Sequence, residues 1–298
     1  MKELQMMIKR NIKLFFKDKG MLFTSLITPL ILLVLYATFL SNVYRDSFTS
    51  ALPAGITVSE DIIDGLVGGQ LFSSLLAVSC VTVSFCCNLL MVQDKVNGAN
   101  NDFMISPIKK STLALAYYVA TAVSTLIVCL IAMVVCCVYL AFIGWYLSFL
   151  DVLCLLLDTF LLVMFGTALS SIVNSFLSSQ GQISAVGSIV SAGYGFICGA
   201  YMPISSFSNG LQKVISFLPG TYGTSLFRNH AVRGVFEAMS EEGIPQEVIK
   251  ALKDSIDCNV YFFENQVSIG AMYAILGVSI AVLIAVYIFI HRLRSKKK

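Results

Sequence analysis

The sequence predicts an all-α integral membrane protein with six transmembrane helices, and three observations support this. The chain is 57% hydrophobic and only 12% charged, whereas soluble domains carry about 25% charged residues. Asp, Glu, Lys, Arg and His are absent from the runs 20–44, 65–93, 111–150, 159–212 and 265–290. These runs are continuously apolar, unlike the alternating strands of a barrel, and a helix satisfies its own backbone in lipid. Because one span needs about 20 residues, the run 159–212 must hold two.

In the first segment, 1–19, residues 2–17 are predicted to form an amphipathic helix that lies in the headgroup plane of the membrane. Its basic residues fall opposite its apolar face, so the cations can approach anionic lipid. The alternative is a basic leader that only sets the membrane topology. The apolar face consists of Leu4, Met7, Ile8, Ile12, Leu14 and Phe15.

The spans follow from the uncharged runs and from the residues that interrupt them. Pro29 lies inside the first span and should kink it. A short outer loop, 45–64, follows that span, and the aromatic pair Trp145 and Tyr146 marks the outer surface after the third. The six spans are predicted at 21–44, 66–92, 112–143, 152–174, 183–201 and 267–290.

The longest segment between spans, 203–266, is predicted to contain an outer re-entrant helical hairpin. Its first part is too apolar for a free loop, and Pro203, Pro219 and several glycines break it too often for a span. Irregular backbone at membrane depth must be buried in protein or line a cavity. The second part is polar, and 246–256 has the apolar spacing of a short amphipathic helix.

The distribution of basic residues predicts the orientation. With the N-terminus inside, the inner segments hold 14 of the 20 Lys and Arg residues. Cytoplasmic loops show this excess, so we expect a multi-pass protein of the cell (plasma) membrane with both termini cytoplasmic. The net charge of +3 reflects this asymmetry and gives no argument for nucleic-acid binding.

Motifs for catalysis, metal binding and nucleotide binding are missing from the sequence. The chain has no Gly-x-Ser-x-Gly, His-Glu-x-x-His or phosphate-binding loop, so we predict no catalytic residue and no metal site. If transport here uses ATP, another chain must supply the ATPase. Eight of the nine cysteines lie in apolar runs, as small buried side chains do. Cys258 lies in the outer loop, where a disulfide to Cys198 is the minor alternative.

Polar and small residues inside the spans are candidates for a pathway or a dimer seam. Small residues at every fourth position let helices approach closely, either between subunits or within the chain. Hydroxyl and amide groups of span two suit a weakly polar pathway or a bundle interior. These candidates are Gly187, Ser191, Gly195 and Gly199 in span five and Ser73, Thr82 and Asn88 in span two. Span four repeats the small-residue spacing at Gly166, Ser170 and Asn174.

Asp158 is the one acid that this topology places inside a span. An ionisable group in a membrane is a functional-site hypothesis by default. Asp158 is only about two helical turns below the outer end of its span. It could instead reach the outer water or the polar side chain of a neighbouring helix. A proton or cation relay would need more than one such group.

The polar loop 94–110 separates the second and third spans on the cytoplasmic side. Residues 99–105 could form one or two helical turns that expose Phe103 and Met104. An exposed apolar tip flanked by charges suits docking into a groove of a partner. A plain connecting loop is the alternative.

The order of motifs resembles the type-2 exporter permeases of the ATP-binding-cassette (ABC) superfamily, the prokaryotic relatives of the G-subfamily fold. After span two come Asp94-Lys95, Gly98, Asp102-Phe103 and Ser106-Pro107. The end of span five has the sequence Gly199-Ala200-Tyr201-Met202-Pro203-Ile204, and Leu218-Pro219 and Arg228 follow it. One difference is that family members often have Arg and Glu early in the loop, where this chain has Lys95 and uncharged asparagines.

The resemblance implies a permease half that works with other subunits. A second permease, identical or different, and two copies of a separate ABC ATPase would complete the transporter. ATP and Mg would bind to the ATPase, and this chain would bind no cofactor. Segment 94–107 would be the coupling helix. Its contact residues would be Asp94, Lys95, Gly98, Asp102, Phe103, Met104, Ser106 and Pro107, and an outer gate would comprise Tyr201, Pro203, Leu218 and Pro219.

The resemblance also implies export of an amphiphilic cargo, such as a drug, antibiotic, peptide or lipid-like molecule, along spans two and five. Neither span offers a strong charge, which argues against a highly charged cargo. An exporter of lipid-linked polysaccharide is the alternative on the same fold. An ion-coupled secondary transporter or channel would need several intramembrane acids, and a membrane-embedded enzyme would need a catalytic cluster.

Overall fold

The computed structural model describes residues 2–53, 58–106, 108–263 and 265–296. Its elements are α1 (Lys2–Lys17), α2 (Lys19–Leu35), the π-helical turn η1 (Tyr36–Leu40), α3 (Ser41–Ala51), α4 (Glu60–Val96), α5 (Ala99–Ile105), α6 (Lys110–Ile143), α7 (Phe149–Phe176), α8 (Gln180–Ile197), the 3₁₀ turn η2 (Ile204–Ser206), α9 (Asn209–Ile215), α10 (Pro219–Ala231), α11 (Arg233–Glu241), α12 (Gln246–Ser255), β1 (Tyr261–Phe262), β2 (Asn265–Gln266) and α13 (Ile269–Lys296).

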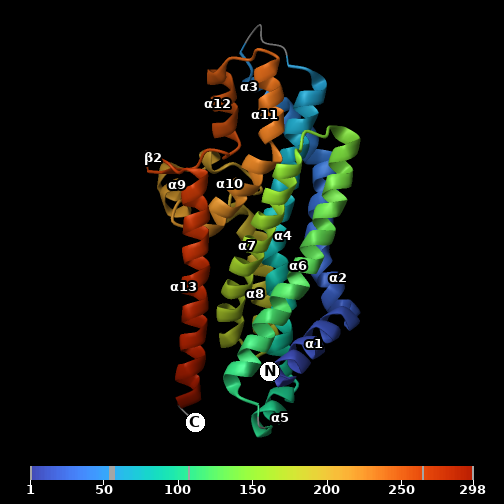
Figure 1. The fold of residues 1–298 in the computed structure, drawn as a ribbon, viewed down its shortest axis with the longest axis vertical. Coiled ribbons are helices and arrows are strands. Elements are labelled where there is room, and N and C mark those ends of the chain that lie inside the picture. Colours follow the sequence, from blue (N-terminus) through green and yellow to red (C-terminus); the bar gives the residue numbers. More distant parts are fainter. Residues whose placement is uncertain (1, 54–57, 107, 264, 297–298) are drawn as a thin grey trace.

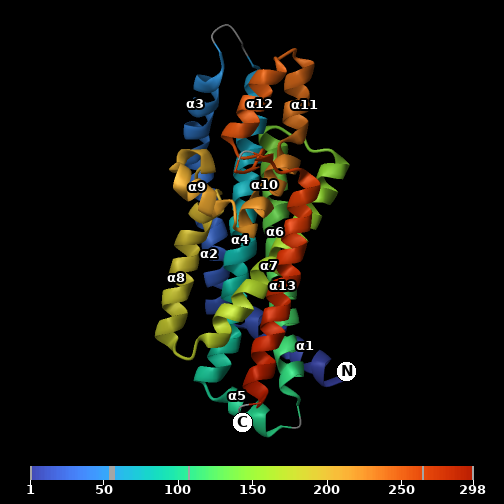
Figure 2. The ribbon, with the colours of Figure 1, turned by 90° about the vertical axis from the view of Figure 1, so that its left-hand side faces the viewer.

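The helices form an elongated bundle with two distinct ends. One end, called the α5 end below, carries α1, α5 and both chain termini, while α3, α11 and α12 lie at the opposite α12 end (Figures 1 and 2). The long helices α4, α6, α7 and α13 run between these ends (Figure 1). The termini and α5 therefore share one side, as the predicted topology requires.

Helix α4 is the centre of the bundle. It is 37 residues long, and nearly all of its residues are buried. Helices α2, α6, α7, α8 and α10 all pack against it. A helix that is apolar all round is stable when other helices surround it on every side, so the continuous apolar run of span two becomes the core of the fold.

Five helical segments are long and apolar enough to cross a membrane: Lys19–Ser50, Glu60–Val96, Lys110–Ile143, Phe149–Phe176 and Ile269–Arg292. They contain the predicted spans one to four and most of span six. The predicted fifth span corresponds to α8, an 18-residue helix rich in Gly and Ser that is not among these five. The structure thus confirms a helical membrane protein, and the sixth crossing stays a prediction.

The helix boundaries follow local capping residues more than the predicted membrane edges. Asp18 ends α1 and accepts a hydrogen bond from the Met21 amide at 3.1 Å, which starts α2. Ser148 and Asp151 form a capping box at the start of α7. Gly98 has φ +81° and lets α5 follow α4 directly. The helices predicted over 2–17 and 99–105 coincide with α1 and α5.

The segment predicted as the outer loop 45–64 is largely helical. Helix α3 continues span one to Ala51, and α4 already begins at Glu60. An ion pair between Arg45 and Asp64 joins the two helices. Among the described residues this connection is helical because charged residues can end the membrane-spanning part of a helix without ending the helix itself, and its position outside the membrane stays a prediction.

The segment after α8 contains two short helices in the place of the predicted hairpin. Helix α9 is mostly exposed, whereas α10 is almost completely buried and packs against α4, α7 and α13. How deep they would lie in a bilayer stays a prediction. The predicted helix at 246–256 is α12, with Ile249 and Leu252 buried. The two-residue ladder β1–β2 had no signal in the sequence.

Gly166 of α7 generates a test of this packing. A Cβ atom at this position would lie 3.0 Å from the carbonyl oxygen of Cys80 and from Ser84 Oγ on α4. We expect Gly166→Val to destabilise the chain by ~1–3 kcal/mol, as overpacking of a close helix contact does. The measurement is the thermal unfolding midpoint in detergent.

Gly277→Val on α13 is the matched control, since a Cβ there meets no atom within 4 Å. Equal midpoints for the two variants would show that α4 and α7 do not pack as described.

Candidate functional site

A cluster at the α5 end ties four helices together. Arg10 of α1 forms a bidentate ion pair with Asp94 of α4, with Nη1–Oδ2 and Nη2–Oδ1 distances of 2.6 and 3.0 Å. The Tyr117 hydroxyl of α6 donates to Asp94 Oδ2 at 2.5 Å. The Arg10 guanidinium also lies 4.9 Å from the ring centroid of Phe103 in α5. This cluster, Arg10, Asp94, Phe103 and Tyr117, is called the anchor cluster below.

In the anchor cluster the positive charge of Arg10 balances the negative charge of Asp94. The side chain of Asp94 is 8% exposed and that of Arg10 is 29% exposed. The hydrogen bond with Asp94 raises the pKa of Arg10, so the guanidinium stays charged. Two parallel charge-assisted hydrogen bonds fix the orientation of the guanidinium as well as its distance. The Asp94 carboxylate is therefore paired with Arg10 and Tyr117 of the same chain. Phe103 is half-buried, although the sequence predicted it to be exposed.

Lys95 is also engaged within the chain. Its Nζ donates to the carbonyl oxygens of Asn174, Ser175 and Leu177 at 3.0–3.2 Å. These carbonyls belong to the C-terminal end of α7, where unpaired acceptors and the helix dipole favour a cation. Asp94 and Lys95 thus fasten the end of α4 to α1 and α6 on one side and to α7 on the other.

The free surface of α5 lies farther along the helix. Asn101 and Asp102 are exposed, and Ile105 is 86% exposed. Gly98 precedes the helix, Met104 lies within it, Ser106 ends it, and Pro107 is outside the described residues. The sequence had pointed to Phe103 and Met104 as exposed apolar residues, because spacing alone could not show that the Arg10 guanidinium lies over the Phe103 ring.

The predicted polar residues of span two are buried inside the chain. Ser73 and Thr82 donate to the carbonyls of Gln70 and Val78 in their own helix. Asn88 donates to Ser170 and Ser171 of α7 at 3.1 and 3.0 Å and accepts from Thr121 of α6. In this conformation these groups connect helices α4, α6 and α7.

The small-residue series of α8 divides into two parts. Gly187 and Ser191 line an open groove, whereas Gly195 is covered by the ring of Tyr201, which would lie 2.3 Å from an added Cβ. Gly199 has φ +74° and turns the chain toward Pro203. The first part is free to face a ligand or a subunit, and the second is used for packing within the chain.

The groove lies between α2 and α8, with α4 as its floor. Its volume is about 1070 Å³, at the upper end of the ~300–1,000 Å³ typical of small-molecule sites. Most of its lining is apolar, and it runs from Asp18 near the α5 end to Tyr201 near the α12 end. It is called the α2–α8 groove below.

The predicted outer-gate residues lie in the turns beyond α8. Tyr201 packs edge-on against Phe196 and donates to the Ser191 carbonyl at 3.3 Å. Pro203 precedes η2, while Leu218 and Pro219 start α10. Of these four, only Tyr201 lines the α2–α8 groove.

Comparison with known proteins identifies the family. A family model described as ABC-2 type transporter matches residues 2–230. The chain belongs to the ABC-2 type transporter family. It is thus a permease subunit of an ABC transporter, and the family accounts for a multi-pass helical chain that has no ATPase motif of its own. No curated protein and no solved structure matched the sequence.

One buried cluster of this ABC-2 permease was missed by sequence reasoning. Asp158 of α7 is 1% exposed and contacts His230 Nδ1 of α10 at 2.7 Å. Tyr273 of α13 donates to its other oxygen at 2.6 Å. Asp158 therefore contacts polar side chains of neighbouring helices. This is one of the two alternatives that the sequence analysis gave, the other being contact with the outer water. Within the described residues, no group of three His, Cys, Asp or Glu side chains is arranged to hold a metal.

The sequence analysis gave a disulfide between Cys198 and Cys258 as the minor alternative, but in the structure both are buried free thiols. Burial raises the pKa of the Cys258 thiol to about 12, so this side chain is a poor nucleophile at neutral pH. Ser225 and Asn229 of α10 donate to the Cys258 carbonyl oxygen.

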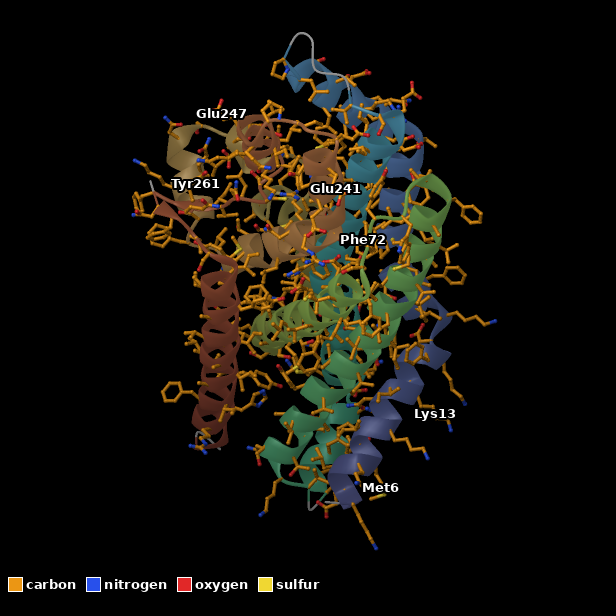
Figure 3. All side chains as sticks on the ribbon, turned by 45° about the horizontal axis from the view of Figure 1, so that its top comes forward. Met6, Lys13, Phe72, Glu241, Glu247 and Tyr261 are labelled. Atoms are coloured by element: carbon orange, nitrogen blue, oxygen red, sulfur yellow. The ribbon has the colours of Figure 1, made fainter. Side chains whose placement is uncertain are left out.

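Arg10→Gln tests the anchor cluster. The substitution leaves Asp94 buried without its counter-charge, and we expect a loss of about 2 kcal/mol, less than for a fully buried pair because Arg10 is partly exposed. The midpoint of thermal unfolding measures the effect. Lys13→Gln, on the same helix and pointing away from the bundle (Figure 3), is the control.

The double variant Arg10→Gln/Asp94→Asn should recover much of the loss, because it removes both charges of the pair. If Arg10→Gln is no less stable than Lys13→Gln, the ion pair does not anchor α1 to α4.

Proposed function

We propose that this permease forms the translocation path of an ATP-driven exporter and that α5 is its coupling helix, docked into a separate ABC ATPase. The exposed side of α5 supports this proposal most directly. Ile105 is an 86% exposed apolar side chain of α5, the helix at the extreme end of the bundle (Figure 1), and Asp102 one turn earlier is exposed too. A single apolar anchor with a charged neighbour suits insertion into a partner's groove.

The connections of α5 suit a part that transmits displacement. The helix is only seven residues long, so a push on it must be carried by its neighbours. The anchor cluster links it to α1, α4 and α6, and Lys95 links the same end of α4 to α7. A rigid connection of this kind would convert closure of the ATPase into a coordinated shift of the spans.

The proposed assembly contains two ATPase subunits, which bind ATP and Mg, and a second permease subunit. The α5 end would lie in the cytoplasm with both termini, as the excess of basic residues in these segments favours. The half of α8 that carries Gly187 and Ser191 would form part of the seam or path between permeases, since both residues line the open groove and a Cβ added at Gly187 would meet no atom within 4 Å.

The α2–α8 groove supports an amphiphilic cargo moved out of the cell. Its lining is mostly apolar, and among the described residues Asp18, at its α5 end, is the one carboxylate that lines it. Such a surface would receive the apolar body of a drug-like, peptide or lipid-like molecule from the membrane. This favours an amphiphile over a lipid-linked polysaccharide, whose long polar chain would need many more hydrogen-bonding groups.

Ile105→Ala tests the coupling helix. Because the side chain supports nothing within the chain, we expect normal folding but at least a tenfold weaker interaction with the ATPase, together with loss of substrate-stimulated ATP hydrolysis. Co-purification and ATPase assays on the reconstituted complex measure both effects.

Met6→Ala is the control, since Met6 of α1 is also an exposed apolar residue at the α5 end (Figure 3). Unchanged assembly and unchanged stimulated hydrolysis in Ile105→Ala would exclude α5 as the docking element.

Cysteine labelling tests the orientation. All nine native cysteines are buried or half-buried, so the unmodified chain gives the background. Glu247→Cys on the exposed surface of α12 (Figure 3) should react with a membrane-impermeant maleimide added to intact cells. Asn101→Cys on α5 should react only after the cells are opened. The reverse pattern would place α5 outside and overturn the proposed coupling.

A further inference from the structure

Two adjoining cavities lie where the α9 segment and the β1–β2 ladder meet the start of α13. The first, called the polar cavity below, is enclosed by η2, α9 and the segment from α12 to β2, and its volume is about 610 Å³. The second, called the apolar cavity, lies between the end of the α9 segment, the ladder and the first turns of α13, with a volume of about 600 Å³. Ser216 and Asn265 line both cavities, so one molecule can occupy the two together.

The polar cavity is lined by an acid and a base that are not paired with each other. Asp254 Oδ1 accepts from Asn259 Nδ2 at 2.7 Å and from the Tyr261 hydroxyl at 3.1 Å, which holds the carboxylate in place. From the described residues its other oxygen, Oδ2, accepts no hydrogen bond. Lys213 Nζ lies 5.8 Å from the centroid of the Phe263 ring, and no described acid forms an ion pair with it.

The second acid that lines the polar cavity, Asp257, is already compensated. Arg228 donates to its Oδ2 at 3.0 Å, and the Ile204 amide donates to the same oxygen at 2.8 Å. The charges that remain for a ligand are therefore the carboxylate of Asp254 and the ammonium of Lys213. A simple anion would be repelled by the first and a simple cation by the second, so the pair favours a zwitterion.

The apolar cavity continues from the polar one into the membrane-spanning part of α13. Its walls include Phe217 and Phe262, whose rings pack edge-on with each other and with Phe263 at centroid distances of 5.0–6.2 Å. Ala271 and Ile275 also line it, and both belong to the first two turns of the apolar segment that begins at α13. Six residues of helix rise about 9 Å, so an alkyl chain here would lead from the edge of the span into the hydrocarbon layer.

This arrangement matches a lipid that sits at the edge of a bilayer, with a charged head beyond the apolar layer and a chain within it. Figure 3 shows Tyr261, which lines the polar cavity, at the outer edge of the bundle near the start of α13. The head is therefore reached from the side of the molecule. Neither cavity shares a lining residue with the α2–α8 groove among the described residues.

The free oxygen of Asp254 favours a primary ammonium over a quaternary one. An N–H group can donate a charge-assisted hydrogen bond to this oxygen, whereas a quaternary ammonium has no hydrogen to donate. Quaternary ammonium groups are typically bound over aromatic rings, and the Phe263 ring is already covered by Lys213. The lysine ammonium is then placed to bind a phosphate.

We propose that the two cavities bind a phospholipid with a phosphoethanolamine head. Asp254 binds the ammonium, Lys213 binds the phosphate, and an acyl chain occupies the apolar cavity along α13. The site lies within one chain and apart from the proposed cargo groove, so it does not depend on the exporter proposal and can be measured without the ATPase.

The test measures lipid binding to the full chain in detergent by native mass spectrometry. The probe is palmitoyl-oleoyl phosphatidylethanolamine, and phosphatidylcholine and phosphatidylglycerol with the same chains test the head group. The head variants are Asp254→Asn and Lys213→Gln. Glu247→Gln and Lys250→Gln are the matched controls, because they make the same charge changes at exposed positions of α12 that line neither cavity.

We expect the unmodified chain to bind phosphatidylethanolamine about tenfold more tightly than the other two lipids. Asp254→Asn should weaken its binding about tenfold, as the loss of one charge-assisted hydrogen bond does, and should abolish the preference over phosphatidylglycerol because the repelling carboxylate is gone. Lys213→Gln should weaken the binding of both lipids. The two control variants should bind phosphatidylethanolamine like the unmodified chain.

The chain site is tested by Ala271→Trp, which fills the apolar cavity and should weaken all three phospholipids. Ala274→Trp on the exposed side of the same helix is its control, since it does not line the cavity. Glycerophosphoethanolamine, which has the head without the chains, should bind at least 100-fold more weakly than the lipid.

Equal affinity for the three lipids in the unmodified chain would overturn the proposal. So would unchanged phosphatidylethanolamine binding in Lys213→Gln, an exposed position where folding is not at risk. Binding of glycerophosphoethanolamine as tight as that of the lipid would show a site for a soluble zwitterion instead. If Ala271→Trp and Ala274→Trp bind all three lipids equally, the chain does not lie in the apolar cavity.

Discussion

The burial of α4 is the constraint on which the rest of the structure depends. A helix enclosed by five others cannot pass its polar groups to water, so each must be satisfied by the helix itself or by a neighbour. Asn88 shows the consequence, since its amide is held by Ser170 and Ser171 on one side and by Thr121 on the other. These bonds fix the register of α6 and α7 on α4, which apolar contacts alone would leave free to slide.

The ends of α4 are fixed by charge. Asp94 pairs with Arg10 at one end, and Asp64 pairs with Arg45 at the other. Thirty residues of helix between them rise about 45 Å, more than the ~30 Å hydrocarbon core of a bilayer. Both pairs can therefore sit outside the apolar layer, where ionised groups are tolerated. Because Arg10 contacts both Asp94 of α4 and Phe103 of α5, a displacement there acts on a stiff helix that reaches the opposite side.

The sequence predicted the positions of the helices better than it predicted which side chains contact one another. Helices 2–17 and 99–105 were found because amphipathic spacing and Gly98 are local signals. The partner of Asp94 was not, because Arg10 lies 84 residues away and was read only as a membrane-facing cation. The contact of Asp158 with His230 spans 72 residues and was equally invisible. Composition can place a charged residue near a membrane, but only the packing of the helices decides which side chain contacts that residue.

The same limit explains why polarity in a span does not by itself distinguish a transport pathway from a bundle interior. Ser73, Thr82 and Asn88 were singled out for being polar, yet each has its hydrogen bonds satisfied within the chain. A transporter must bind its cargo in one state and release it in another, so a group satisfied by its own helix offers a ligand little. A group left unpaired gains a bond when the ligand enters and loses it when the ligand leaves, and that difference is what a transport cycle can use.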